Sequence, residues 1–204
     1  MGHSMHSFYA RRTQPYVYGG HSIFTAEVAS TVNENLLMKH LLAEEKNEEM
    51  KKYLLNMHIE SFRTTLFRQT MFAEFEDITH QAVEEGKALT AGWLCSEYEK
   101  LNSKYFGDAL APDPYIQYEW ARIPHFYRAF YVYKYATGYS AAAAISDIIL
   151  KDGPKDYIRF LTTGESDYPI ELLKIAGVDM STPTPVEAAM ETFGNLVDEL
   201  ERLV

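Results

Sequence analysis

The sequence G-H-S-M-H-S at residues 2–7 is followed by A-E-V-A-S-T-V-N-E-N at residues 26–35, and these two stretches organise the chain. A zinc site of the H-E-x-x-H type needs two histidines one helical turn apart, a carboxylate from a second helix, and an open position for water. His3 has the context of the second histidine of H-E-x-G-H-S. Glu27 follows near the start of a strongly helical pattern, so His3 and Glu27 are candidate metal ligands.

The rest of that motif would precede the sequence. Its first histidine and its general-base glutamate would lie four and three residues before His3, ahead of Met1. We therefore expect an incomplete zinc motif, whose missing part is supplied by a segment N-terminal to His3.

Longer stretches of the chain resemble the oligoendopeptidase F branch of the thimet oligopeptidase-like zinc peptidases. They are G-H-S-M-H-S-F-Y-A-R at 2–11, F-T-A-E-V-A-S-T-V-N-E-N-L-L at 24–37, F-R-Q-T-M-F-A-E-F-E at 67–76 and I-P-H-F-Y-R-A-F-Y-V-Y-K-Y-A-T-G at 123–138. The resemblance covers essentially the whole chain. It implies an all-α, multi-helix, zincin-type C-terminal catalytic region that lacks its N-terminal side.

The resemblance also implies roles for residues of the first two stretches. His3 and Glu27 resemble two of the three protein ligands of one Zn²⁺ ion. Glu34 resembles the carboxylate that hydrogen-bonds a ligand histidine and fixes its tautomer. Ser30, one turn after Glu27, would brace the same face, and His6 would line the site without binding the metal directly.

The aromatic segment 123–138 resembles the part of the family that stabilises the oxyanion formed during peptide hydrolysis. His125 and Tyr131 correspond to these catalytic donors, and Tyr127, Tyr133 and Tyr135 are candidate substrate contacts. We expect a helix from about Phe126 to Lys151, in which Tyr131 shares a face with both Tyr127 and Tyr135. Tyrosines at such spacing are more often core or groove lining, and which tyrosine faces the oxyanion stays open.

The implied function is that of a zinc-dependent metalloendopeptidase that hydrolyses short peptides and is inactive as this chain alone. The alternative is a non-catalytic helical module that binds peptides or a partner. A helical di-metal protein is disfavoured because paired E-x-x-H motifs are lacking. Glu76 and His80 have the spacing of a metal pair, but nothing nearby in the sequence supplies further ligands.

Composition limits the partners and the location. The chain has 204 residues, 47% hydrophobic and 24% charged, with a formal net charge of −10. This charge argues against nucleic acid and anionic membranes as partners, and no apolar run is long enough to span a bilayer. The single cysteine, Cys95, excludes an intrachain disulfide and fits the cytoplasm; we expect it to be buried.

Periodicity and helix-breaking residues predict the organisation. We expect one helical domain over residues 1–204, with self-association through surface left uncovered. One helix is expected over 47–85, ended by Gly86, and Pro112 and Pro114 exclude a helix through 106–114. In the last helix we expect Thr184 as N-cap of T-P-V-E and a buried stripe. That stripe comprises Val186, Met190, Phe193, Val197 and Leu200.

Overall fold

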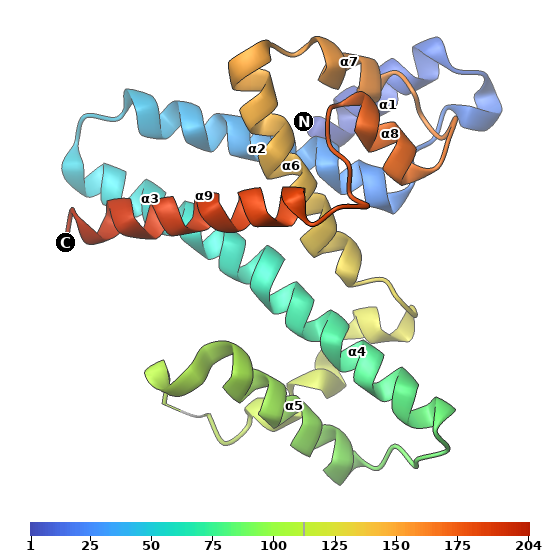
Figure 1. The fold of residues 1–204 in the computed structure, drawn as a ribbon, viewed down its shortest axis with the longest axis vertical. Coiled ribbons are helices and arrows are strands. Elements are labelled where there is room, and N and C mark those ends of the chain that lie inside the picture. Colours follow the sequence, from blue (N-terminus) through green and yellow to red (C-terminus); the bar gives the residue numbers. More distant parts are fainter. Residues whose placement is uncertain (112) are drawn as a thin grey trace. The chain divides into compact units, whose positions relative to one another are not determined.

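The computed structural model describes residues 1–111 and 113–204 and contains no strand among them (Figure 1). The predicted all-α fold is therefore confirmed, and Pro112 lies outside the described residues. The α-helices are α1 (Gly2–Thr13), α2 (Ile23–Glu44), α3 (Glu48–Phe62), α4 (Arg68–Glu84), α5 (Ala91–Phe106), α6 (Tyr133–Asp152), α7 (Lys155–Leu161), α8 (Pro169–Ile175) and α9 (Thr184–Glu201).

The chain divides into two compact units. The first contains residues 1–66 and 137–204, and the second contains residues 67–136. In the first unit α1 packs on α2, and α3 lies along α9 (Figure 1). Its core is formed by apolar side chains of α2, α6, α7 and α8, among them Val32, Ile145, Phe160 and Leu173.

In the second unit α5 packs against both α4 and η4, a 3₁₀ segment over Ile116–Arg122. Its core contains Phe75, Tyr98 and Val132 together with Met71, Phe72, Leu101 and Ile123. Cys95 of α5 is a free, buried thiol, as expected. In the parts of the chain that are described, no helix has the length and apolar character needed to cross a membrane.

The helix expected over residues 47–85 is interrupted. A π-helical segment, η2 (Arg63–Phe67), separates α3 from α4. Just before and within it, the hydroxyls of Ser61 and Thr64 donate to the carbonyls of His58 and Glu60 at 2.7 and 2.8 Å. Such side-chain bonds compete with the regular helical ladder and accompany local distortion. The predicted end of the helix is correct, since Gly86 has a φ of 79°.

The helix expected from about Phe126 begins only at Tyr133. Residues Pro124–Tyr127 form a separate 3₁₀ segment, η5. Phe130 has a φ of 54°, in the left-handed region, which interrupts any right-handed helix. Tyr127 and Tyr131 therefore do not share a helical face.

Two expectations for the last helix are wrong. Thr184 lies inside α9, and Pro183 occupies the cap position without a side-chain hydrogen bond. Val186 and Met190 are 38% and 40% exposed. The buried positions of α9 are instead Pro185, Ala189 and Leu196.

Candidate active site

His3 and Glu27 lie next to each other on the two packed helices α1 and α2. Nε2 of His3 is 4.0 Å from Oε1 of Glu27, and their side chains are 50% and 29% exposed. Two ligand atoms at about 2.1 Å from one tetrahedral zinc are roughly 3.4 Å apart. A small side-chain rotation would bring this pair to that separation, so the donors fit a shared Zn²⁺ ion.

Gly2 explains how the two helices come so close. A Cβ atom placed on Gly2 would lie 2.2 Å from the carbonyl oxygen of Ala29 and 2.5 Å from the Cα of Ser30. No real side chain tolerates such contacts, so only glycine permits this approach. Gly2 directly precedes His3, and Ala29 is two residues after Glu27. The close approach at Gly2 therefore brings His3 and Glu27 near each other.

His6 follows His3 on α1 and is buried. It is 0% exposed, and its ring stacks on that of His21 with centroids 4.6 Å apart. Burial, aided by the neighbouring His21 and His3, lowers the pKa of His6 to about 4. Neither ring nitrogen of His6 has a hydrogen-bond partner among the described residues. Its predicted role as site lining stays a prediction.

Glu34 and Ser30 follow Glu27 along α2. Glu34 lines a pocket of about 350 Å³ in the first unit, together with Tyr139 and the buried pair His58 and Asn35. Burial raises the pKa of Tyr139 to about 12; the hydrogen bond with Ser61 opposes this shift and the nearby Glu34 carboxylate adds to it. Within the described residues no hydrogen bond joins Glu34 or Ser30 to His3, so their supporting roles stay predictions.

The second unit brings together three of the predicted aromatic residues. The ring of Tyr131 stacks on that of His125, with centroids 5.5 Å apart and planes 13° apart. The Tyr135 hydroxyl donates to the Tyr131 hydroxyl at 3.3 Å and lies 3.5 Å from Nε2 of His125. Because the Tyr131 oxygen accepts this bond, the Tyr131 proton stays available for another acceptor.

The other two tyrosines are placed elsewhere. Tyr127 is 88% exposed and lines a different pocket, while Tyr133 is 39% exposed at the first position of α6. The Lys134 ammonium lies 5.6 Å from the ring centroid of Tyr131 and 5.8 Å from that of Tyr133. The structure therefore groups Tyr131 and Tyr135 with His125, and separates Tyr127 from them.

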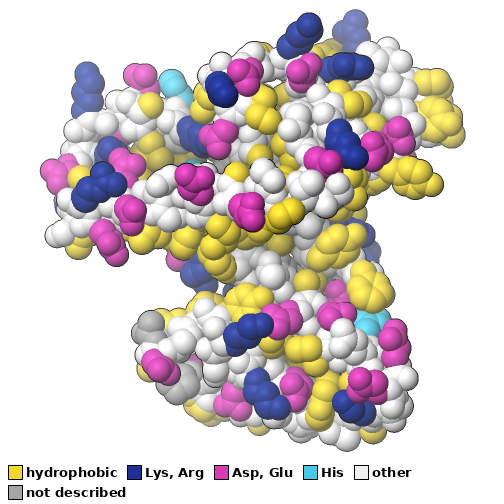
Figure 2. All heavy atoms as spheres, viewed as in Figure 1, with side chains coloured by type: hydrophobic (Ala, Val, Ile, Leu, Met, Phe, Trp, Pro, Cys, Tyr) yellow, Lys and Arg dark blue, Asp and Glu magenta, His cyan; other side chains and the backbone are white. Residues whose placement is uncertain are grey.

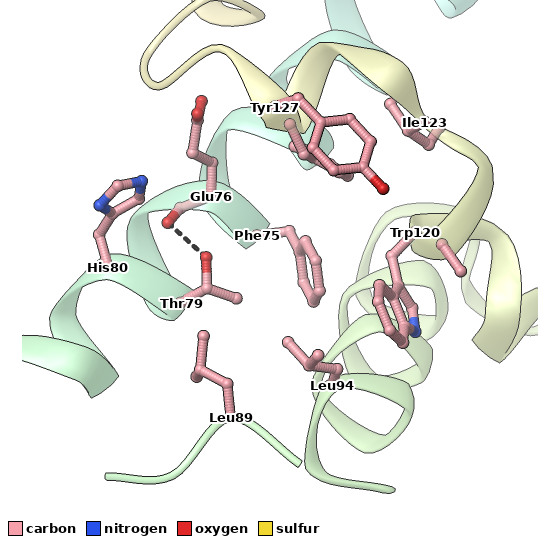
Figure 3. Close-up of a pocket in the computed structure, with 11 residues that line it drawn as sticks. Phe75, Glu76, Thr79, His80, Leu89, Leu94, Trp120, Ile123 and Tyr127 are labelled. Atoms are coloured by element: carbon pink, nitrogen blue, oxygen red, sulfur yellow. Dashed lines mark hydrogen bonds between the residues drawn. The ribbon is translucent and has the colours of Figure 1, made fainter. Parts of the chain in front are cut away.

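An apolar pocket of about 200 Å³ lies within the second unit (Figure 3). Its walls include Phe75, Leu94, Trp120 and Tyr127, from α4, α5, η4 and η5. Glu76 and His80 stand one helical turn apart at its edge and point to the same side of α4 (Figure 3).

Two residues that shape the candidate sites are not predicted by the sequence motifs. One is Gly2, although a glycine directly before a candidate ligand is a signal of close backbone approach. Phe130 gave no signal, because its aromatic neighbours continue the helical pattern. Across residues 1–111 and 113–204, no group of three or more His, Cys, Asp or Glu side chains could hold a metal ion.

The sequence matches the family model described as Peptidase family M3 over residues 1–192. The chain belongs to peptidase family M3. The match confirms the resemblance seen in the sequence, and peptidases of this family are generally zinc-dependent.

Curated relatives carry peptidase names. The chain is 54% identical to the oligopeptidase PepF of Bacillus subtilis and 49% identical to an oligoendopeptidase F homolog of Lactococcus lactis, in both cases over its full length. It covers 31% and 34% of those proteins, and thus about a third of each.

A solved structure has the same fold. The crystal structure of oligoendopeptidase-F from Enterococcus faecium matches 99% of the chain with a TM-score of 0.89 and 45% sequence identity. The chain covers 37% of that protein. The fold therefore agrees with the family assignment, and the activity of the longer proteins stays a proposal for this chain.

Proposed function

We propose that this chain is part of a zinc-dependent endopeptidase that hydrolyses short peptides. The observation that carries the proposal is the 4.0 Å approach of His3 Nε2 to Glu27 Oε1, on helices held together at Gly2. Imidazole nitrogen and carboxylate oxygen are the donors that catalytic zinc sites use. A further ligand and the general base would come from the segment that precedes His3 in the motif.

Zinc, when bound, would supply Lewis-acid chemistry, which polarises a peptide carbonyl and makes water acidic enough to attack near neutral pH. His3 and Glu27 would hold the ion, Glu34 would orient a ligand histidine, and Ser30 and His6 would support that face. Each is a role for this chain's own side chains.

Tyr131 and His125 would act on the substrate. In hydrolysis of a peptide bond, the carbonyl oxygen gains negative charge and needs donors that are already in place. The Tyr131 proton is left available because Tyr135 donates to its oxygen. We propose Tyr131 and His125 as the oxyanion donors, and Tyr127, Tyr133 and Tyr135 as contacts to the rest of the peptide.

A second candidate function is peptide binding without hydrolysis. The apolar pocket of the second unit, lined by Phe75, Trp120 and Tyr127, favours it because it suits an apolar side chain. For either function we propose the cytoplasm as location, since the only cysteine is unpaired and buried.

The test uses a hybrid in which residues 1–204 replace the matching third of the B. subtilis oligopeptidase PepF. Cleavage of a fluorogenic short peptide would be followed for the hybrid and for its Glu27→Gln and Tyr131→Phe variants, with Glu44→Gln as control. Glu44 is an exposed carboxylate at the far end of the same helix.

We expect hydrolysis by the hybrid and the control. Glu27→Gln should abolish it, and Tyr131→Phe should lower kcat by about 10²–10³-fold, as for loss of an oxyanion donor. Unchanged hydrolysis in Glu27→Gln would overturn the proposal. Peptide binding that persists without zinc and without hydrolysis would favour the second candidate.

A further inference from the structure

Glu76 is a buried carboxylate that the proposed function does not use. It lies on α4 with 4% of its surface exposed. Its Oε1 accepts a hydrogen bond from the backbone N–H of Phe130 at 2.7 Å, although the two residues are 54 positions apart in the chain. A buried carboxylate loses its hydration, and hydrogen bonds of this kind must compensate for that loss. Glu76 therefore ties α4 to the segment around Phe130.

Phe130 has a backbone conformation that needs support. Its φ of 54° is the only positive value for a non-glycine residue among those described. In this conformation the Cβ of an L-residue crowds its own backbone, so surrounding contacts must hold it. The His80 ring provides a second contact, 4.6 Å from the Phe130 ring between centroids and inclined by 31°.

These two contacts come from one face of α4. Glu76 and His80 are four residues apart and point to the same side of the helix (Figure 3). This spacing would suit a metal pair, but here both side chains contact Phe130. Glu76 accepts a hydrogen bond from the Phe130 backbone, and the His80 ring packs on the Phe130 ring.

The supported residue determines where Tyr131 lies. Phe130 directly precedes Tyr131, and the next residue, Val132, is 0% exposed in the core of the second unit. Tyr131 therefore lies between Phe130, whose backbone N–H is hydrogen-bonded to Glu76, and the buried Val132. From that position its ring stacks on His125 and its hydroxyl accepts from Tyr135.

We propose that Glu76 is a positioning residue, which holds Phe130 in its left-handed conformation and thereby aligns Tyr131 with His125. The catalytic consequence rests on the proposed function, but the structural part does not. Without the acceptor on Glu76, Phe130 relaxes to a negative φ, the peptide leading to Tyr131 rotates, and the Tyr131–His125 stack separates.

The first experiment is independent of activity. NMR on this chain would follow the hydrogen exchange of the Phe130 amide and the ring-proton shifts of His125, in the parent chain and in four variants. Glu76→Ala removes the acceptor, Glu76→Gln restores an oxygen of the same reach, and His80→Ala removes only the ring contact. Asp77→Ala, which changes the exposed neighbouring carboxylate, is the matched control.

In Glu76→Ala we expect the Phe130 amide to lose protection by about tenfold or more and the His125 signals to move, since the local structure opens. Glu76→Gln and Asp77→Ala should retain both signals, and His80→Ala should give an intermediate loss. An unchanged Phe130 amide in Glu76→Ala overturns the proposal, and so does equal loss in Glu76→Gln.

The second experiment measures the catalytic consequence in the PepF hybrid. Glu76→Ala should lower kcat by about 10- to 100-fold with KM nearly unchanged, because misplaced donors act on the transition state. Glu76→Gln should restore most of the rate. Unaltered kcat in Glu76→Ala, in a hybrid where Tyr131→Phe is impaired, overturns the catalytic part. If the hybrid cleaves no peptide, the proposed function fails while the NMR result still decides the positioning role.

Discussion

The Nε2 atom of His3 lies 4.0 Å from the Oε1 atom of Glu27, and both side chains keep access to solvent. The two residues come from different helices, α1 and α2, whose contact depends on the missing side chain of Gly2. The candidate metal pair is therefore a product of helix packing, and changes to that packing should change it.

Gly2→Ala should destabilise the first unit and separate the pair. The new Cβ would lie 2.2 Å from the Ala29 carbonyl oxygen, so α1 must move away from α2. Overpacking of this kind costs about 1–3 kcal/mol. Urea unfolding measures the cost, and Gly194→Ala is the control.

The control is informative because it has the opposite expectation. A Cβ on Gly194 meets nothing within 4 Å, and the residue lies inside α9. Replacing an exposed helical glycine by alanine should stabilise the protein by about 0.5–1 kcal/mol. If both variants unfolded at the same urea concentration as the parent, this result would contradict the close approach of α1 to α2 at Gly2.

The helical positions of His3 and Glu27 could be predicted from the sequence, whereas the conformation of the loop around Phe130 could not. Both residues stand in segments with a strongly helical local pattern, and such a pattern is enough to predict that they lie on helices. The bond from Phe130 to Glu76 joins residues 54 positions apart, and only tertiary packing creates it. The aromatic run continues a helical period through Phe130, so its left-handed conformation could not be predicted.

The wrong expectation for α9 has a similar origin. The T-P-V-E motif fits a capping box, but the helix already begins at Thr184, with Pro183 before it. The buried face then includes Ala189 and Leu196 rather than Val186 and Met190. Alanine is a weak predictor of burial because its side chain is small, and the burial of Ala189 follows from how α9 packs on its neighbours.

Stability should rise with pH between about 4 and 6.5. Burial, followed by the charge of Lys39, lowers the pKa of His58 from 6.5 to about 4, and His6 shows the same shift. In this window the unfolded chain binds protons that the folded chain excludes, so the free energy of unfolding increases as pH rises. Each histidine adds up to about 1.4 kcal/mol per pH unit.

Urea unfolding of the metal-free chain at pH 4.5, 5.5, 6.5 and 7.5 measures this dependence. We expect His58→Gln, which cannot titrate there, to flatten the slope, and substitution of the exposed His40 to leave it unchanged. Stability that falls as pH rises through this window would contradict the buried, neutral histidines.

Removal of the Glu119 carboxylate should destabilise the second unit. Glu119 is 8% exposed, accepts a hydrogen bond from the Tyr98 hydroxyl at 2.5 Å and forms ion pairs with Arg68 and Arg122. Glu119→Ala leaves the buried Tyr98 hydroxyl and Arg68 without this partner, which should cost about 3–5 kcal/mol.

Tyr98→Phe removes only the hydroxyl and should cost about 1–3 kcal/mol. Arg122, whose side chain is 70% exposed, should tolerate alanine with a change below about 1 kcal/mol. Equal effects of the three substitutions in urea unfolding would show that burial does not determine the strength of this network.

Self-association is expected at high concentration. Apolar side chains reach the surface of the first unit, among them Leu37, Tyr53, Val186 and Met190, at 38–58% exposure. Figure 2 shows hydrophobic side chains among interspersed acidic and basic ones on the visible face. Exposed apolar surface favours association, so light scattering should report a mass that grows with concentration. A constant monomer mass would contradict this expectation.

The most direct test of the zinc site is a zinc titration of this chain, observed by NMR at the ring protons of His3. Glu27→Gln removes one proposed ligand, and Glu44→Gln is the control on the same helix. We predict that zinc shifts the His3 signals saturably in the parent and the control. The affinity for zinc should fall about tenfold or more in Glu27→Gln, because even the loss of a residue that only hydrogen-bonds to a metal ligand lowers metal affinity by that much. Equal affinity in all three proteins, or no shift at His3, would contradict the proposed metal site.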